Sequence, residues 1–157
     1  MTVCIAAIAT ENNAEYIVFA TDHMITTRLG QYEHPIEKYC HVKKNMIAML
    51  SGRVLLTDKL LPKDEYADSL SFEEIQQDIF SRFKQVRKEE IQRSILDIYG
   101  VDETFIKNNL MIQIQNRYID TLFSKISQYR LNTSVLLIGY DKNNKAQISM
   151  ISEDTCE

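Results

Sequence analysis

Apolar runs alternate with short polar turns over the first third of the chain. Residues 2–9 and 15–21 are apolar and branched, and the polar stretch 10–14 between them predicts the turn of a hairpin whose first strand is buried. Residues 36–42 and 46–51 repeat this pattern around a turn at 43–45, which predicts a second hairpin. The polar segment 28–35, which contains Gly30 and Pro35, is expected to be a loop.

The hydrophobic period changes to that of helices in the middle of the chain. Residues 53–61 predict a short helix that Pro62 ends. Ser71 and Glu74 have the spacing of a capping box, and the long helix that follows is expected to bend within 87–90 and to be capped by Gly100. Asp102 is expected to cap a second helix. The predicted apolar stripes are Phe72, Ile75, Ile79, Phe83, Val86, Ile91, Ile95 and Ile98 in the first helix, and Met111, Ile114, Tyr118, Leu122, Ile126 and Tyr129 in the second.

The end of the chain returns to the strand pattern. Residues 134–141 and 146–152 are two apolar runs around the polar turn 142–145, which predicts a third hairpin. The order hairpin, hairpin, helix pair, hairpin predicts an α+β fold, in which helices pack on a mostly antiparallel sheet. We expect residues 1–157 to form a single domain.

Composition is that of an ordinary globular protein, with 45% hydrophobic and 25% charged residues. The net charge of −4 does not favour nucleic-acid binding, and no apolar run is long enough to span a bilayer. The three widely spaced cysteines form no disulfide or zinc pattern, so we expect a cytoplasmic protein. The four glycines and three histidines form no nucleotide-binding, serine-hydrolase or metal motif, and we expect neither cofactor nor metal.

Several short stretches together resemble a known family. They are TVCIAA from Thr2, IVFATD ending at Asp22, EKY around Lys38, IAMLSG around Met49, and the later LLIGYDKNNKAQISMI. In residue type and spacing they resemble the proteasome β-type subunits and their bacterial relatives, which are N-terminal-nucleophile (Ntn) hydrolases. The resemblance implies a layered sandwich of antiparallel sheets and helices, and a threonine-type peptidase or amidohydrolase of a proteasome-like assembly.

The start of the chain suits such chemistry. Removal of Met1 would place an α-amine on Thr2, the residue that also carries the hydroxyl. That amine has a reference pKa near ~8, so it is partly neutral at working pH and can accept the hydroxyl proton. A strand that begins at once would hold the nucleophile rigidly, as catalysis requires.

The resemblance implies three further site residues. Lys38 is the second catalytic residue, whose ammonium would favour the neutral amine by up to about 4 kcal/mol at ~4 Å and an effective dielectric of ~20. Asp22 pairs with Lys38 and fixes its position. The backbone amide of Met49 is the oxyanion donor, at a position where many relatives have glycine.

Other interpretations of these residues stay open. Thr2 can be an ordinary second residue, and Asp22 and Lys38 can be a turn residue and a solvated strand lysine. Cys4 with His23 is a weaker candidate nucleophile pair, because a cysteine in a buried strand usually serves packing. Ser51 is expected to cap a helix rather than to act as a nucleophile.

Two other functions remain open at this stage. The chain can be a non-catalytic Ntn-fold subunit that builds an oligomer, or an Ntn enzyme that cleaves a small amide rather than peptides. An intact-mass measurement separates the first of these from the enzymes, since retention of Met1 favours the non-catalytic subunit.

The resemblance also implies a missing part. In the family, further helices and strands follow the last strand pair and supply a Ser/Asp group that supports the nucleophile; no such pair can be assigned before Glu157. We therefore expect that the C-terminal half is missing and that open apolar faces associate with another copy or a companion subunit. The helix pair within 71–130 is the expected contact surface.

Overall fold

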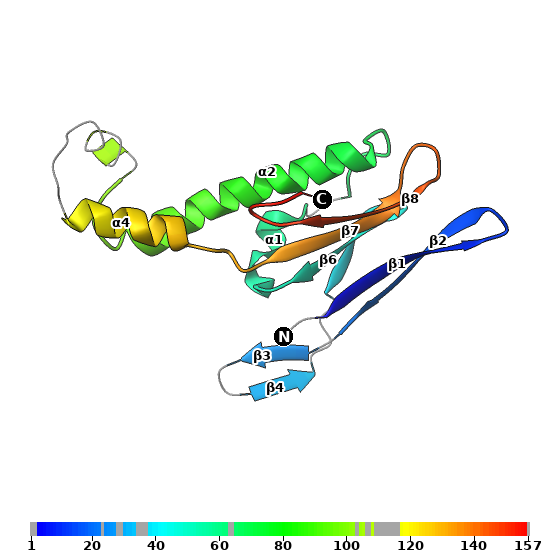
Figure 1. The fold of residues 1–157 in the computed structure, drawn as a ribbon, viewed down its shortest axis with the longest axis horizontal. Coiled ribbons are helices and arrows are strands. Elements are labelled where there is room, and N and C mark those ends of the chain that lie inside the picture. Colours follow the sequence, from blue (N-terminus) through cyan, green and yellow to red (C-terminus); the bar gives the residue numbers. More distant parts are fainter. Residues whose placement is uncertain are drawn as a thin grey trace. The chain divides into compact units, whose positions relative to one another are not determined.

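The computed structural model describes residues 3–22, 24–27, 30–33, 38–62, 65–102, 104–105, 108 and 117–156. We predicted one domain, and the structure divides the chain into two compact units, Met1–Phe83 with Asn132–Glu157 and Lys84–Leu131. All strand pairs in the described residues are antiparallel, and helices accompany them (Figure 1). The predicted α+β class is therefore confirmed.

The chain begins with a hairpin of strands β1 (Cys4–Glu11) and β2 (Ala14–Thr21). Asn12 and Asn13 form its turn with φ of 50° and 63°, a conformation that asparagine tolerates well and that matches the twist of the two strands. The predicted hairpin is confirmed, although its first strand begins and ends two residues later than expected.

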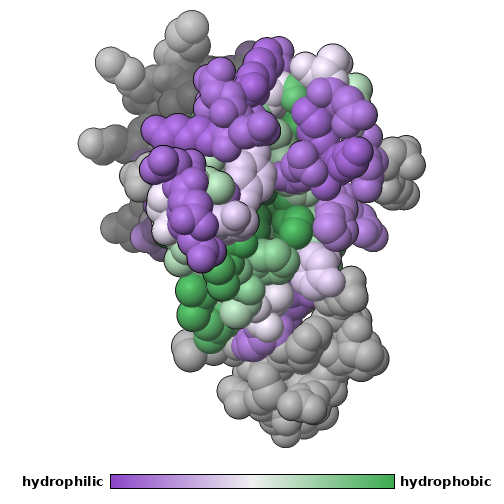
Figure 2. Space-filling view, turned by 90° about the vertical axis from the view of Figure 1, so that its right-hand side faces the viewer, coloured by the Kyte–Doolittle hydropathy of each residue, from purple (hydrophilic) through white to green (hydrophobic). Residues whose placement is uncertain are grey.

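The prediction that the first strand is buried is wrong. Ile5 is 58% exposed and Val18, on the neighbouring strand, is 62% exposed. An apolar strand normally indicates burial on both faces, but within the described residues one face of this hairpin is left uncovered. Figure 2 shows apolar side chains gathered in one area of the molecule, bordered by hydrophilic ones.

A second hairpin lies where we predicted a loop. Strands β3 (Met24–Thr27) and β4 (Gly30–Glu33) pair with each other in a sheet of their own. The loop prediction is wrong for Gly30–Glu33 because a polar sequence can still pair, as Thr26 does with Gln31. Pro35 lies outside the described residues.

The main sheet has four strands in the order β5-β6-β7-β8. β7 comes after the helical middle of the chain, yet it pairs with β6, so that Leu50 lies opposite Val135. The strands predicted here are confirmed. Their bounds are β5 Tyr39–Lys43, β6 Met46–Ser51, β7 Ser134–Tyr140 and β8 Ala146–Ile151.

A short helical segment follows the main sheet's second strand. It consists of the 3-10 helix η1 (Val54–Leu56) and helix α1 (Thr57–Leu60), as predicted before Pro62. Ser51 is the last residue of β6 and Leu56 is the N-cap of α1, so the predicted helix-capping role of Ser51 is wrong.

Helix α2 (Phe72–Ile91) begins with the predicted capping box. The Ser71 amide donates to the Glu74 carboxylate at 2.7 Å, and the Glu74 amide donates to the Ser71 hydroxyl at 3.2 Å. The first five residues of the predicted stripe are all buried. The four of them that lie in the first unit are part of its core, together with buried side chains of the four-stranded sheet: Phe72, Ile75, Ile79, Phe83, Val42, Ala48, Leu50, Val135, Leu137 and Ile151.

Removal of the Ser71 hydroxyl is expected to destabilise this helix start. We predict that Ser71→Ala lowers the free energy of unfolding by about 1 kcal/mol, because the Glu74 amide loses its acceptor. Urea denaturation followed by circular dichroism measures the change. Ser81→Ala is the control, since its exposed hydroxyl bonds the carbonyl of Gln77 in mid-helix and should contribute little. Equal losses in both variants would contradict the capping role.

The first half of α2 and the β1–β2 hairpin lie along opposite faces of the four-stranded sheet (Figure 1). On the helix side, the Gln76 amide donates to the Ser149 hydroxyl of β8 at 2.7 Å. On the hairpin side, the rings of Phe19 and Tyr39 meet edge to face with centroids 6.0 Å apart. The unit is therefore layered in the order helix, sheet, hairpin.

The second unit is helical. α2 runs into the π-helix η2 (Gln92–Leu96), Gly100 follows with φ of 65°, and α4 spans Arg117–Gln128. The Arg87 guanidinium donates to two carbonyls at the end of α4, each at 3.3 Å. The core of this second unit consists of Ile91, Ile95, Leu96 and Leu122. Four partly buried side chains pack against it: Tyr99, Val101, Ile126 and Tyr129.

The predicted stripes of this unit are confirmed in part. Ile91 and Ile95 are buried, but Ile98 is 74% exposed, because the wider turn of the π-helix shifts the phase of the stripe. The Asp102 carboxylate accepts from the Phe105 amide at 2.6 Å, as expected of a cap. The predicted stripe residues Met111, Ile114 and Tyr118 have no described side chains.

No helix in the described ranges is both long and apolar enough to cross a membrane.

Candidate active site

An ion pair joins Lys38 and Asp22, two of the residues selected from the sequence. Lys38 directly precedes β5 and Asp22 directly follows β2, and the Lys38 ammonium lies 2.6 Å from the Asp22 carboxylate. The Lys38 side chain is 2% exposed and that of Asp22 is 23% exposed. The predicted contact between them is confirmed. The part-exposed carboxylate balances the charge of the buried ammonium and holds it in a fixed position.

Backbone hydrogen bonds fix where this pair lies. The Asp22 amide donates to the Val3 carbonyl at 3.1 Å, and the Leu50 amide donates to the Lys38 carbonyl at 2.9 Å. The ion pair is thereby tied to the start of β1 and to the end of β6. Thr2, the residue before Val3, lies outside the described residues, so its approach to Lys38 stays a prediction.

The ion pair favours the ionised carboxylate. The hydrogen bond from Lys38 is the main cause that lowers the pKa of Asp22 below its ordinary value of 3.8, and the backbone contact with Val3 acts in the same direction. Partial burial opposes both but does not outweigh them. The folded chain therefore binds the Asp22 proton more weakly than the unfolded chain does.

This shift makes stability depend on pH. A depressed carboxyl pKa contributes stability above the unfolded value near 3.8 and loses it as pH falls through the lower folded value. We predict that Asp22→Asn removes this part of the acid-induced loss, so that its stability declines less between pH 4 and pH 2. Thermal melts across that range measure the effect. Asp68→Asn, at an exposed position, is the control, and an unchanged pH dependence in Asp22→Asn would contradict the assignment.

A cleft of about 370 Å³ lies between the start of β1 and the main sheet, and Cys4, which lines it, is within electrostatic reach of Asp22 and Lys38. No charged side chain is among the described residues that line it. Apolar and thioether groups dominate, and two hydroxyls and one thiol supply the polar atoms. The lining residues are Val3, Cys4, Met49, Ser51, Ser134, Leu136 and Met150.

The geometry of β6 does not favour the Met49 amide as an oxyanion donor. Met49 lies opposite Tyr39 of β5 and Leu136 of β7, in the interior of the sheet. The amide of its neighbour Leu50 points to the β5 side, where it donates to Lys38. Successive residues of a strand direct their backbone groups to opposite sides, so the Met49 amide points to β7 rather than into the cleft. Met49 is among the residues that line the cleft, although it is fully buried.

Cys4 lies at the cleft but is poorly suited to act as the nucleophile. Its thiol is half-buried and lies 3.9 Å from the Leu50 carbonyl. Burial, and then the negative charge of Asp22, raise the pKa of the Cys4 thiol, which disfavours the reactive thiolate. His23, the base suggested for it, lies outside the described residues.

Two hydroxyls at this site were not assigned to it from the sequence: Ser51 was expected to cap a helix, and Ser134 was not singled out. Ser51 and Ser134 lie opposite each other on β6 and β7, and both line the cleft. Their positions at the end of one strand and the start of another, far apart in sequence, gave no motif. The strand register, which the sequence did not reveal, brings them together.

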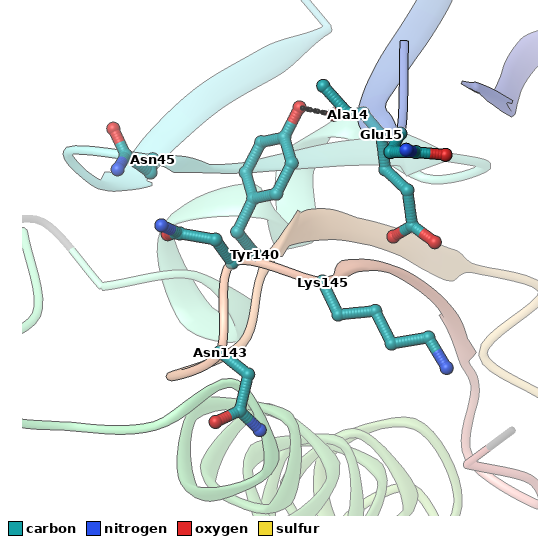
Figure 3. A pocket seen from close by; sticks show the side chains of 8 residues that line it. Ala14, Glu15, Asn45, Tyr140, Asn143 and Lys145 are labelled. Atoms are coloured by element: carbon teal, nitrogen blue, oxygen red, sulfur yellow. Dashed lines mark hydrogen bonds between the residues drawn. The ribbon is translucent and has the colours of Figure 1, made fainter. Parts of the chain in front are cut away.

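A larger cavity of about 610 Å³ lies at the other end of β1, among the hairpin turns (Figure 3). The Tyr140 hydroxyl donates to the Glu15 carbonyl at 3.3 Å, and the Ala146 amide donates to the Glu15 carboxylate at 2.7 Å. These bonds fasten the hairpin to the main sheet. The cavity is open and is lined by turn residues, and it lies apart from the Lys38–Asp22 pair, so we do not assign the chemistry to it. Its lining is Asn13, Ala14, Glu15, Asn45, Tyr140, Asn143, Asn144 and Lys145.

The described part of the chain holds no group of three or more histidine, cysteine, aspartate or glutamate side chains that could bind a metal ion. No protein-family model matches the chain, and no curated protein sequence matches it.

Proposed function

We propose that the chain is an Ntn-type threonine amidohydrolase with the layered fold of the proteasome β-type subunits. The observation that carries the proposal is the buried Lys38 ammonium, paired with Asp22 at 2.6 Å and tied through the Asp22 amide to Val3. A lysine with a 2% exposed side chain, directly before β5, has to be stabilised by its surroundings. Asp22, which holds Lys38, is bonded in turn to Val3, the residue that follows Thr2, and this supports a catalytic role for the lysine.

The proposed reaction uses the free α-amine of Thr2 as the base. The Thr2 hydroxyl attacks the amide carbonyl carbon while its proton passes to the α-amine. The carbon–nitrogen bond then breaks, the leaving amine takes that proton, and the acyl group stays on Thr2 as an ester. Water hydrolyses the ester by the same steps. Lys38 supplies positive charge where the hydroxyl loses its proton, and Asp22 holds Lys38 in place.

The cleft suggests which substrates the site accepts. Its lining has no described charge, and the half-buried Leu136 and the half-exposed Met150 offer apolar surface. We therefore propose that the group next to the cleaved bond is uncharged and apolar, whether it belongs to a peptide or to a small amide.

A substitution at the cleft rim tests this preference. Met150 is 50% exposed and lines the cleft. We predict that Met150→Lys weakens hydrolysis of apolar chromogenic amides at least tenfold in kcat/KM and improves the relative rate with acidic ones. Leu55→Lys, at an apolar position that is 91% exposed and outside the cleft lining, is the matched control. An unchanged ratio of apolar to acidic substrates would contradict the proposed occupancy of the cleft.

The proposed enzymatic function is tested by measuring the intact mass and the amide-hydrolysis activity of the same protein sample. The chain that has lost Met1 is expected to cleave amide substrates, and the chain that retains it is expected to be inactive because Thr2 then lacks a free amine. Complete retention of Met1 in the isolated protein, with no activity, would contradict the enzyme. That result would favour the second candidate, a non-catalytic Ntn-fold subunit, for which the exposed apolar hairpin is the supporting observation.

A further inference from the structure

One face of the β1–β2 hairpin is apolar and uncovered. Residues directly opposite each other on the two strands share a face, so Ile5, Ala7 and Ala9 of β1 lie on the same face as Ala20, Val18 and Tyr16 of β2. All six are exposed. We call these six residues the outer face of the hairpin.

The opposite face packs on the main sheet. Cys4 contacts the Leu50 carbonyl and Phe19 contacts Tyr39, and both belong to the alternate set of positions. The hairpin is therefore apolar on both sides, and this second face is covered only in part, since Ile8 and Phe19 remain 45% and 36% exposed. Strands that are apolar on both faces are typical of a middle layer between two others.

The outer face is comparable in size to the largest apolar patch of a typical soluble monomer, and such patches are often functional. Ile5, Tyr16 and Val18 expose 58%, 50% and 62% of their surfaces, and the three alanines lie between them. The exposed apolar area is on the order of 400 Å², which on a soluble protein commonly marks an interface. Two such faces packed together, with their surroundings, would bury on the order of 1,000 Å², enough for a weak but specific dimer.

The pattern of large and small residues on the outer face suits packing against itself. Each directly opposite pair contains one large side chain and one alanine: Ile5 with Ala20, Val18 with Ala7, and Tyr16 with Ala9. The large side chains thus project beside hollows above the alanines. The side chains of two copies can therefore interdigitate. No charged residue lies among the six, so the face does not require a partner of opposite charge.

We propose that two copies of the chain associate through their outer faces, packing hairpin on hairpin around a two-fold axis near Ala7 and Val18. This surface differs from the helix pair that the sequence favoured. Among the described residues of 71–130, the exposed large apolar side chains are Ile98 and Phe105, which are too few for such a contact.

The molecular mass in solution tests this proposal. Sedimentation equilibrium between 1 and 100 µM is expected to give a dimer, and Val18→Lys is expected to raise its Kd at least 100-fold, because each dimer would bury two unpaired ammonium groups. Leu55→Lys, which adds the same charge at a 91% exposed apolar position outside the hairpin, should leave the dimer intact. A monomer at 100 µM, or equal effects of the two variants, would overturn the proposal.

A labelling experiment keeps the test independent of how Val18→Lys folds. We compare the rates at which a maleimide modifies Ala7→Cys and Leu55→Cys as the protein concentration rises, with the unmodified chain as background for its native thiols. The rate at position 7 should fall several-fold as the dimer forms while the rate at position 55 stays constant. Equal rates at every concentration would show that the outer face stays open, and would overturn the proposal even if another dimer forms.

Discussion

Replacement of Thr2 by alanine in the Met1-free chain is expected to abolish amide hydrolysis, with a loss of at least 10³-fold in kcat. The hydroxyl is the proposed nucleophile, and no other described side chain at the cleft combines nucleophilicity with an adjacent base. Progress curves with a chromogenic amide measure the loss. Far-UV circular dichroism and thermal melts should be unchanged, since one small polar side chain is removed from the end of the chain.

Two further variants, compared with Thr2→Ala, show whether the hydroxyl or the thiol is the nucleophile. Thr2→Ser should keep part of the activity, because it preserves the hydroxyl and the α-amine. Cys4→Ala should keep most of it, because the raised pKa of the Cys4 thiol argues against a thiolate nucleophile. Activity that survives in Thr2→Ala but disappears in Cys4→Ala would assign the chemistry to the thiol instead.

Replacement of Lys38 by methionine is expected to reduce kcat nearly as far as loss of the nucleophile does. Nucleophile, base and stabilising charge act as one unit, so removal of one member costs almost the whole effect. Methionine has a similar length and can fill the buried space, and the 23% exposed Asp22 carboxylate can be solvated from outside. The fold should therefore survive. A double variant with Thr2→Ala should be no less active than either single variant.

Lys44→Met is the matched control for Lys38. Lys44 is an exposed lysine in the turn between β5 and β6, so its loss removes the same charge without removing the ion pair. It should leave kcat unchanged within twofold. A Lys38→Met chain that is folded and retains full activity would show that the ion pair serves stability alone.

Local patterns predicted most of the elements because their causes are local. The capping box of Ser71 and Glu74 and the asparagine turn after β1 depend on residues within a few positions of each other. The position of Ile98 was missed for a reason that is also local, since hydrophobic period alone does not reveal where a helix widens into a π-turn.

The candidate site was predictable only in part. Asp22 and Lys38 were selected because the short stretches that contain them resemble a known family. The ion pair between them was found as expected. The cleft could not be predicted, because its two serines become neighbours through the register of β6 on β7. The exposed face of the hairpin was also missed, because an apolar strand in a sequence does not say whether anything covers it.

The measurement that tests the proposed function most directly is the identification of the acylated residue. The Met1-free chain is incubated with an uncharged, apolar β-lactone, which acylates an activated hydroxyl or thiol, and is then digested and sequenced by tandem mass spectrometry. The proposal predicts a single acyl group on Thr2, in an amount that falls in step with residual activity and is lost in Lys38→Met. An adduct on Cys4, or Thr2 left unmodified while the chain remains active, would contradict it.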